Sequence, residues 1–234
     1  MNESATNGVI VFDFDNTLVH SRIDFGAIRG ALLDLRRELR LPPVDEEALR
    51  RLSIGQMVEA GEAQDAAYGA EAWRIVLEYE AAGMLAATIE PGASESLAAV
   101  RALGSRLAVL TNNARAATLA GLEKFGMLDA FDLVLTRDEV PMKPDPTGVL
   151  RARAELGGGT LRTVVVGDSW LDGMAARLAG VPFVAFQTPP SVLADRSVKA
   201  WTTVERLEEL PALLSGPWPE VGPVAGGGDQ IANG

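Results

Sequence analysis

Cysteine is absent from this sequence, and histidine and lysine are scarce. Without any cysteine among its 234 residues, the chain has no disulfide bonds, thiolate nucleophiles or cysteine-bound zinc. The single histidine is His20, and the lysines are Lys124, Lys143 and Lys199, so a site that needs a lysine has three candidates. No apolar run approaches the about 18 residues that cross a bilayer, and we expect no membrane association.

Basic residues are also outnumbered. The chain has 21 basic and 32 acidic residues and a net charge of −11, which argues against a nucleic-acid partner because phosphate-backbone binding needs a basic face. A small anionic substrate stays possible, since a metal ion and a few donors can reverse the potential inside a pocket. Residues 1–8 lack the features of a signal peptide, and we expect a cytoplasmic protein, either a monomer or a homodimer.

In the second half of the sequence, apolar segments of strand length alternate with amphipathic segments of helix length. The predicted strands cover residues 107–110, 131–135, 163–166 and 182–186. The predicted helices cover residues 94–103, 114–125, 146–156 and 171–179. This alternation indicates βαβ units and a parallel sheet with helices on both faces. The predicted fold is therefore α/β, with a Rossmann-like sheet.

Residues 22–88 follow a different pattern. They contain helical patterns at 27–39, 46–61 and 70–84 and no convincing strand. We therefore expect an all-helical cap at residues 22–88, inserted into a core made of residues 8–21 and 89–215. Residues 216–234 are rich in proline and glycine, and this composition predicts a disordered tail.

Two carboxylates mark the end of the first predicted strand. The β-branched and aromatic residues 9–12 are followed by Asp13 and Asp15, and positions i and i+2 of a strand point to the same side. Burying two like charges together is costly unless something neutralises them. A divalent cation can do so, and oxygen ligands favour magnesium or calcium.

Polar residues also follow the later strands. Thr111 and Asn112 end one strand, Lys143 lies in a loop after the next, and Asp168 ends a third, with Asp172 four residues further on. Each alone fits a turn, a helix cap or a solvated lysine. Because parallel sheets place ligands at the carboxyl ends of their strands, the set in this order predicts one shared site.

The set resembles the haloacid dehalogenase superfamily of phosphohydrolases. The matching motifs are Asp-x-Asp-x-Thr at residues 13–17, Thr111, Lys143 and Gly-Asp-Ser-x-x-Asp at residues 167–172. The resemblance covers residues from about 8 to 215, and the insert resembles the helical C1 cap of the phosphoglycolate phosphatase and β-phosphoglucomutase branch. One departure is Asn16, where much of that branch has glycine, and it removes no catalytic group.

The resemblance implies a magnesium-dependent phosphatase that hydrolyses a small phosphorylated metabolite through an aspartyl phosphate. Asp13 would be the nucleophile, and Asp15 would protonate the leaving alcohol and later deprotonate water. Thr111 and Asn112 would bind the phosphate together with Lys143, whose charge would also offset that of the nucleophile.

The resemblance also implies a set of Mg²⁺ ligands. These would be a carboxylate oxygen of Asp13, the backbone carbonyl of Asp15 and the carboxylate of Asp168, while Asp172 would act outside the direct ligands or through a water. Arg50, Arg51 and Gln56 of the insert offer a polar edge that could cover the site, with an ordinary solvated helix face as the alternative.

The same residues also have to be compared with those that related functions require. A phosphomutase of the β-phosphoglucomutase type would need the same core residues, and the sequence does not exclude it. A non-catalytic phosphate-binding relative would be expected to lack one of the motif residues, and none is missing. The acid at Asp15 disfavours a dehalogenase. Phosphonate-cleaving relatives use a cap lysine, and residues 22–88 contain no lysine.

Overall fold

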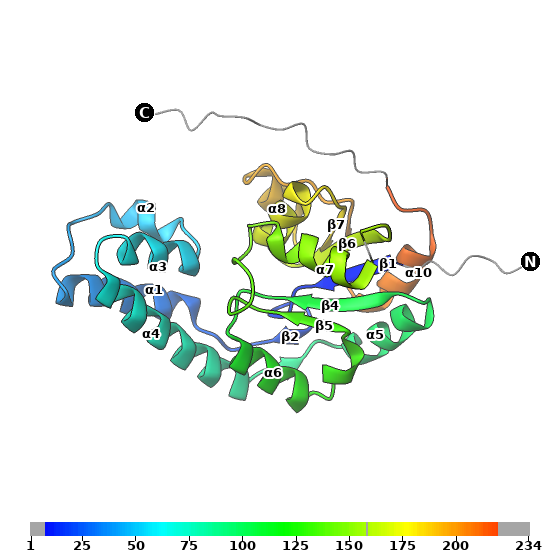
Figure 1. Cartoon of the computed structure of the whole chain (residues 1–234), viewed down its shortest axis with the longest axis horizontal. Coiled ribbons are helices and arrows are strands. Elements are labelled where there is room, and N and C mark those ends of the chain that lie inside the picture. Colours follow the sequence, from blue (N-terminus) through cyan, green and yellow to red (C-terminus); the bar gives the residue numbers. More distant parts are fainter. Residues whose placement is uncertain (1–7, 158, 220–234) are drawn as a thin grey trace, which may run out of the picture.

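The computed structural model describes residues 8–157 and 159–219, and in this part of the chain six strands form one sheet (Figure 1). In spatial order the strands are β5 (Leu133–Leu135), β4 (Arg106–Leu110), β1 (Gly8–Phe12), β6 (Arg162–Gly167), β7 (Phe183–Phe186) and β8 (Thr202–Val204). All neighbouring pairs are parallel. The edge strand β8 was not predicted. Because β1 lies between β4 and β6, the residues that follow it lie at the middle of the sheet.

Helices cover both faces of this sheet, as the sequence predicted. In β1, Val9 and Val11 join one apolar cluster, whereas Ile10 and Phe12 join the other, which is the alternation of a strand buried on both sides. The Ile10 face is covered by α5 (Ala93–Ala102), α6 (Arg115–Lys124) and α10 (Leu210–Ser215). The Val9 face is covered by α7 (Thr147–Gly157), α8 (Trp170–Leu178) and α9 (Pro190–Ala194). The α/β, Rossmann-like fold class is therefore confirmed.

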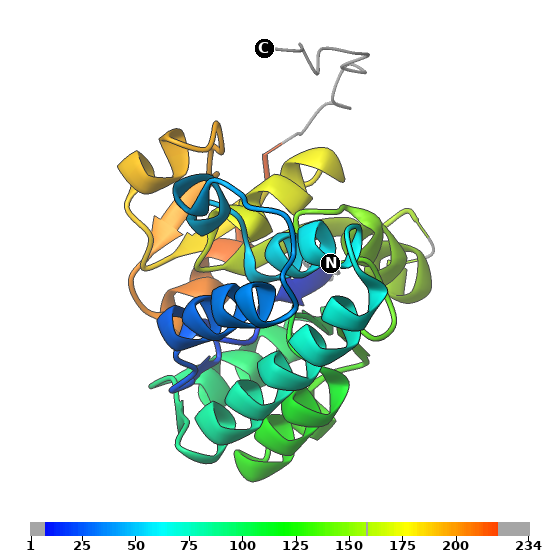
Figure 2. The same ribbon diagram turned by 90° about the vertical axis from the view of Figure 1, so that its left-hand side faces the viewer.

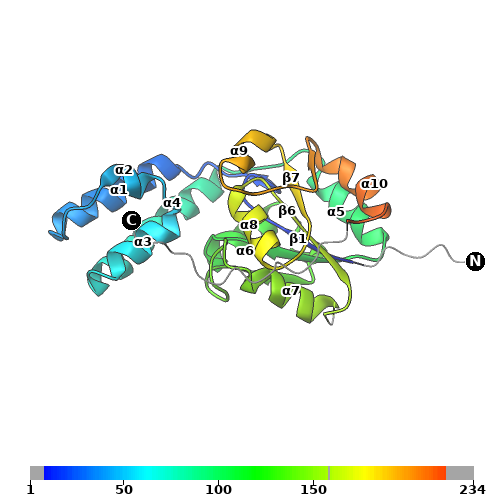
Figure 3. The ribbon, with the colours of Figure 1, turned by 90° about the horizontal axis from the view of Figure 1, so that it is seen from above.

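Residues 25–85, all within the described part, form four helices with an apolar core of their own. The helices are α1 (Phe25–Glu38), α2 (Glu46–Arg50), α3 (Ile54–Glu62) and α4 (Ala66–Leu85). Their shared cluster includes Ile28, Leu32, Met57 and Tyr68, which are at most 1% exposed. We call α1–α4 the helical cap. It lies beyond one end of the sheet in Figures 1 and 3 and faces the viewer in Figure 2.

One predicted cap helix is in fact two. The pattern of residues 46–61 predicts one continuous helix, but the chain leaves the helical conformation after α2 and resumes it at α3. Ser53 starts the second helix: its Oγ accepts the Gln56 N–H at 3.2 Å, and Gln56 Oε1 accepts the Ser53 N–H at 2.9 Å. This reciprocal capping box satisfies two otherwise free donors, and its Ser-x-x-Gln signal was present in the sequence.

Two short strands connect the cap to the core. β2 (Val19–His20) and β3 (Thr88–Ile89) pair antiparallel. Neither short strand was predicted, and no convincing strand was expected within residues 22–88. At the same junction, Lys124 Nζ donates to the carbonyls of Leu85 at 2.8 Å and Ala87 at 2.9 Å. The lysine thus satisfies carbonyl groups that a helix end leaves without partners.

The described chain ends against the core. The indole Nε1 of Trp218 donates to the Leu214 carbonyl at 2.9 Å, and the ring lies 6.4 Å from that of Trp201. Residues 216–219 belong to the segment that was predicted to be disordered, yet Trp218 is packed there. The remaining residues of that segment, 220–234, lie outside the described residues. In the described ranges, no helix combines the length and apolar character that a membrane span requires.

Candidate active site

Most of the residues singled out in the sequence line one cavity of about 370 Å³ between the sheet and the cap, whereas Asp172 and Gln56 are not among its lining residues. Those contributed by the core are Asp13, Asp15, Thr111, Asn112, Lys143 and Asp168. They come from the ends of β1, β4 and β6 and from the loop after β5. The parallel sheet thus brings together residues that are up to 155 positions apart in the sequence, from Asp13 to Asp168.

Lys143 lies between two carboxylates. Its Nζ donates to Asp13 Oδ1 at 2.5 Å and to Asp172 Oδ1 at 2.6 Å, and all three side chains are buried. The hydroxyl of Thr17 donates to the other Asp13 oxygen at 3.3 Å. Burial alone would lower the pKa of Lys143, but the two carboxylates outweigh it and raise that pKa above its usual value. The lysine is therefore charged and fixes the orientation of Asp13.

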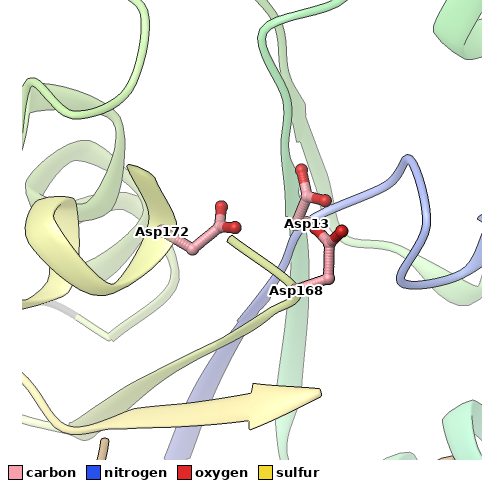
Figure 4. A group of neighbouring side chains, drawn as sticks. All are labelled: Asp13, Asp168 and Asp172. Atoms are coloured by element: carbon pink, nitrogen blue, oxygen red, sulfur yellow. The ribbon is translucent and has the colours of Figure 1, made fainter. Parts of the chain in front are cut away.

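Asp13, Asp168 and Asp172 form an acidic cluster (Figure 4) in which one oxygen of each lies within 4.8 Å of the others. Burial raises the pKa of Asp13 to about 7, with Lys143 opposing the shift and Asp172 adding to it. Burial and repulsion from Asp13 raise the pKa of Asp168 to about 8. Such carboxylates need a cation to stay ionised together at neutral pH, and hard oxygen ligands suit Mg²⁺. The residues therefore fit a divalent ion.

Asp15 does not belong to this carboxylate cluster. Its side chain is buried, and neither oxygen makes a well-formed hydrogen bond to the described residues. Burial raises the pKa of Asp15, although the nearby Ser21 hydroxyl and N–H favour the charged form. The turn that follows requires a positive φ of 59° at Asn16, which asparagine tolerates better than most residues. Asp15 can therefore hold a proton and transfer it to a bound molecule.

The side chain of Asn112 positions Lys143. Its Nδ2 donates to the Lys143 carbonyl at 2.9 Å, and its Oδ1 accepts the Lys143 N–H at 2.8 Å. What remains free for a ligand is the backbone N–H of Asn112, for which the described residues supply no acceptor. Thr111 Oγ1 accepts the N–H of Asn113 at 3.2 Å, so its hydroxyl hydrogen is left to donate elsewhere.

Asp172 is held by the first turn of its own helix. One of its oxygens accepts the Ser169 N–H at 3.1 Å and also the Ser169 hydroxyl, while the other accepts Lys143. A Cβ at Gly167 would lie 2.5 Å from the Asp172 carboxyl carbon, so only glycine permits this close approach. Asp172 therefore orients Lys143 beside Asp13.

Sequence reasoning missed a contact between the cap and the loop after β4 (residues 111–114). Glu80 of α4 is buried, pairs with Arg137 Nη1, and accepts the Ala114 N–H at 3.2 Å. Arg137 also donates to the Asn112 carbonyl at 3.0 Å and lies 4.8 Å from the Trp73 ring centre. Burial raises the pKa of Glu80 despite this pair. No sequence signal distinguishes Glu80 from the other glutamates of the cap helices.

The loop between α2 and α3 also reaches the cavity. Arg51 lines it, and its carbonyl accepts a hydrogen bond from Arg196 Nη2 at 3.4 Å. The Arg196 guanidinium in turn lies 4.6 Å from the Trp170 ring centre. Gln56, which was considered for the polar edge, instead caps α3.

Comparison with known proteins gives consistent matches. A family model described as haloacid dehalogenase-like hydrolase matches residues 8–180. Phosphoglycolate phosphatase from Rhodospirillum rubrum is 31% identical, over 95% of this chain and 94% of the relative. Phosphoglycolate phosphatase from Cereibacter sphaeroides (strain ATCC 17029) is 35% identical, over 76% of this chain and 84% of the relative.

Solved structures share the fold. YfnB from Bacillus subtilis, a HAD-hydrolase solved with bound magnesium and described as showing interdomain movement, superposes with a TM-score of 0.60. The match is 19% identical and covers 89% of this chain and 98% of YfnB. The layered sheet and the inserted helices are therefore a known arrangement.

Proposed function

The chain belongs to the haloacid dehalogenase-like hydrolase family and is a phosphatase, and from this premise we propose that it hydrolyses a small phosphorylated metabolite through an aspartyl phosphate, with Mg²⁺ as cofactor. The observation that carries the proposal is the contact of Lys143 Nζ with Asp13 Oδ1 in the cavity. A lysine held there offsets the charge of both the nucleophile and the incoming phosphate.

In the first step, Asp13 attacks the phosphorus atom with one carboxylate oxygen. The bond from phosphorus to the alcohol oxygen of the substrate breaks, and the phosphoryl group is left on Asp13. Asp15 gives its proton to the leaving oxygen, so the alcohol departs neutral. The raised pKa of Asp15 supports this role because it favours the protonated form before the reaction.

In the second step, Asp15 accepts a proton from water as the water oxygen attacks phosphorus. The bond between phosphorus and the Asp13 oxygen breaks, which releases inorganic phosphate and restores the carboxylate. The Thr111 hydroxyl, the Asn112 N–H and Lys143 donate hydrogen bonds to the phosphate oxygens in both steps.

Asp13 and Asp168 would hold the Mg²⁺ with their carboxylates, and Asp15 with its backbone carbonyl. The ion supplies positive charge that lets a carboxylate approach a phosphate. Asp172 lies close enough to Asp13 and Asp168 to be a further ligand, but its bonds to Lys143 and Ser169 favour the supporting role that we predicted for it.

The substrate is a small molecule. The cavity, about 370 Å³, is at the small end of ligand pockets, and the relatives are named for phosphoglycolate. We therefore propose 2-phosphoglycolate as the first compound to test.

The proposed domains remain a core of residues 8–21 and 89–215 and a cap of residues 22–88 that covers the site.

Phosphate release from p-nitrophenyl phosphate and 2-phosphoglycolate, with saturating MgCl₂ or with EDTA, tests the proposal. Asp13→Asn should lower kcat by about 10⁴-fold or more because it removes the nucleophile, and EDTA should abolish turnover. Asp195→Asn, on the exposed surface, is the matched control and should leave kcat unchanged. Full activity of Asp13→Asn, or in EDTA, would refute the mechanism.

A further inference from the structure

Arg29 is a partly buried cation of the cavity without an anionic partner. It lies on α1 of the cap and lines the same cavity as Asp13 and Lys143. Its Nη1 donates to the Leu52 carbonyl at 2.7 Å and contacts the Met57 sulfur at 3.2 Å. Among the side chains that the structure describes, no carboxylate pairs with it.

The other arginines around the cavity are placed differently. Arg137 is paired with Glu80, and Arg51 lies 3.5 Å from Glu47 on the exposed side of the cap. Arg196 is exposed and rests on an aromatic ring. Arg29 alone among these four combines partial burial with the lack of a described carboxylate or aromatic partner.

Partial burial without a counter-charge is unfavourable for Arg29. Burial lowers the pKa of its guanidinium, and no nearby carboxylate opposes the shift. Because Nη1 is fixed by the Leu52 carbonyl, the guanidinium is held in place while its Nε and Nη2 donors stay free of described partners. Two adjacent donors in a rigid plane match the two oxygens of a carboxylate.

We propose that Arg29 binds the carboxylate of the substrate and thereby selects phosphorylated carboxylic acids. This inference rests on the proposed function, which places the phosphate of the substrate at Asp13 and Lys143. The cavity then has two anion sites: the lysine and the proposed metal site of the core for the phosphate, and the arginine of the cap for the carboxylate. The apolar side chains of Phe25, Trp73 and Val76 also line it, and they strengthen a charge pair by excluding water.

A double-mutant cycle between protein and substrate tests the inference. The substrates are 2-phosphoglycolate and the phosphate ester of glycolamide, in which a neutral amide replaces the carboxylate. The enzymes are the wild type and Arg29→Gln, and kcat/KM is measured for all four pairs. We expect the wild type to prefer the carboxylate by about 10- to 100-fold, the range for charge-assisted hydrogen bonds. Arg29→Gln should lose this preference while it hydrolyses the amide about as well as the wild type.

Two further variants separate recognition from folding. Arg74→Gln removes an exposed cap arginine that does not line the cavity and should keep the preference for the carboxylate. Arg29→Lys keeps the positive charge but lacks the two coplanar donors of the guanidinium, and it should show part of the wild-type preference for the carboxylate. If Arg29→Gln does not fold, the inference is tested by the preference of the wild type between the two esters. Equal turnover of both esters would overturn it.

The outcomes distinguish this inference from the proposed function. Equal losses by Arg29→Gln on both esters would mean that Arg29 only supports the cap, and would overturn the inference. Hydrolysis of p-nitrophenyl phosphate without preference between the esters would overturn it as well while leaving the phosphatase mechanism intact. If the wild type releases phosphate from no ester in Mg²⁺, the proposed function itself fails.

Discussion

On the core side of the cavity, Lys143 is bonded to two carboxylates, whereas on the cap side Arg29 is bonded to a carbonyl oxygen and a sulfur atom. Asp13 and Asp172 share Lys143, so these three charges have partners before any ligand arrives. Arg29 bonds to the Leu52 carbonyl and has no carboxylate partner among the described residues.

This difference matches the roles that we propose for the two sides. A group that reacts with every substrate has to be oriented in advance, and the buried network around Lys143 achieves that. A group that selects among substrates has to be left unsatisfied until the right ligand binds, as Arg29 is. We therefore expect core substitutions to lower kcat with all substrates, and cap substitutions to change the ranking of substrates.

Among the variants that test this comparison, Lys143→Met should have the largest effect. Methionine fills a similar volume but leaves Asp13 and Asp172 without their shared cation. We expect kcat to fall by about 10³-fold with every substrate, because an aimed charged donor is lost. The free energy of unfolding near neutral pH should fall by about 3 kcal/mol, because a buried ion pair is broken.

Steady-state kinetics and urea unfolding measure these two effects. Lys199→Met, which replaces an exposed lysine, is the control and should change neither. A loss that depends strongly on the substrate would contradict the division between the two sides, since it would give Lys143 a role in selection.

Glu80→Gln should have the next largest effect, and it tests the contact between the cap and the core. It removes the charge that pairs with buried Arg137, and breaking a buried pair costs about 3 kcal/mol. Because Arg137 also holds the Asn112 carbonyl, kcat should fall as well. Arg74→Gln, which breaks exposed pairs on the same helix, is the control for helix α4.

Thermal or urea unfolding measures the change in stability. A second variant separates the contribution of the Glu80–Arg137 pair from that of its surroundings. Replacing both partners, as Glu80→Leu with Arg137→Met, should restore most of the lost stability, because burial raises the pKa of Glu80 even in the presence of the arginine. If this double variant also regained full kcat, Arg137 would have no part in placing the loop after β4.

The same division explains what could be predicted from the sequence. Asp13, Thr111 and Asp168 each end a parallel strand, and the carboxyl ends of parallel strands share one edge, so their meeting follows from local patterns. The strand order β5-β4-β1-β6-β7-β8 does not follow from such patterns. It depends on where each βα crossover places the next strand in the sheet.

The cap residues of the cavity were not predictable in this way. Glu80 contacts the core and Arg29 lines the cavity because of how the cap is placed on the core, and periodicity within a helix says nothing about that placement. Ser53 is a different case. The Ser-x-x-Gln signal of a new helix was present in the sequence, but the helical pattern around it obscured the break.

The smallest predicted effect concerns Mg²⁺ and pH, and it should be confined to the core side. Without metal, the pKa values of Asp13 and Asp168 are about 7 and about 8, above the 3.8 of a free aspartate. The folded state then binds more protons than the unfolded state, so the free energy of unfolding falls as pH rises from about 4 to about 8. Mg²⁺ competes with these protons.

The rise in Tm caused by saturating MgCl₂, relative to EDTA, should therefore be larger near pH 8 than near pH 5.5, by about 5 °C. Thermal unfolding monitored across this pH range measures it. Asp168→Asn should remove most of the pH-dependent part, because it takes away one of the two titrating groups and also one of the proposed Mg²⁺ ligands, whereas Arg29→Gln should leave it unchanged. A Tm shift that is independent of pH, or one that Arg29→Gln abolishes, would mean that the ion does not bind at these carboxylates.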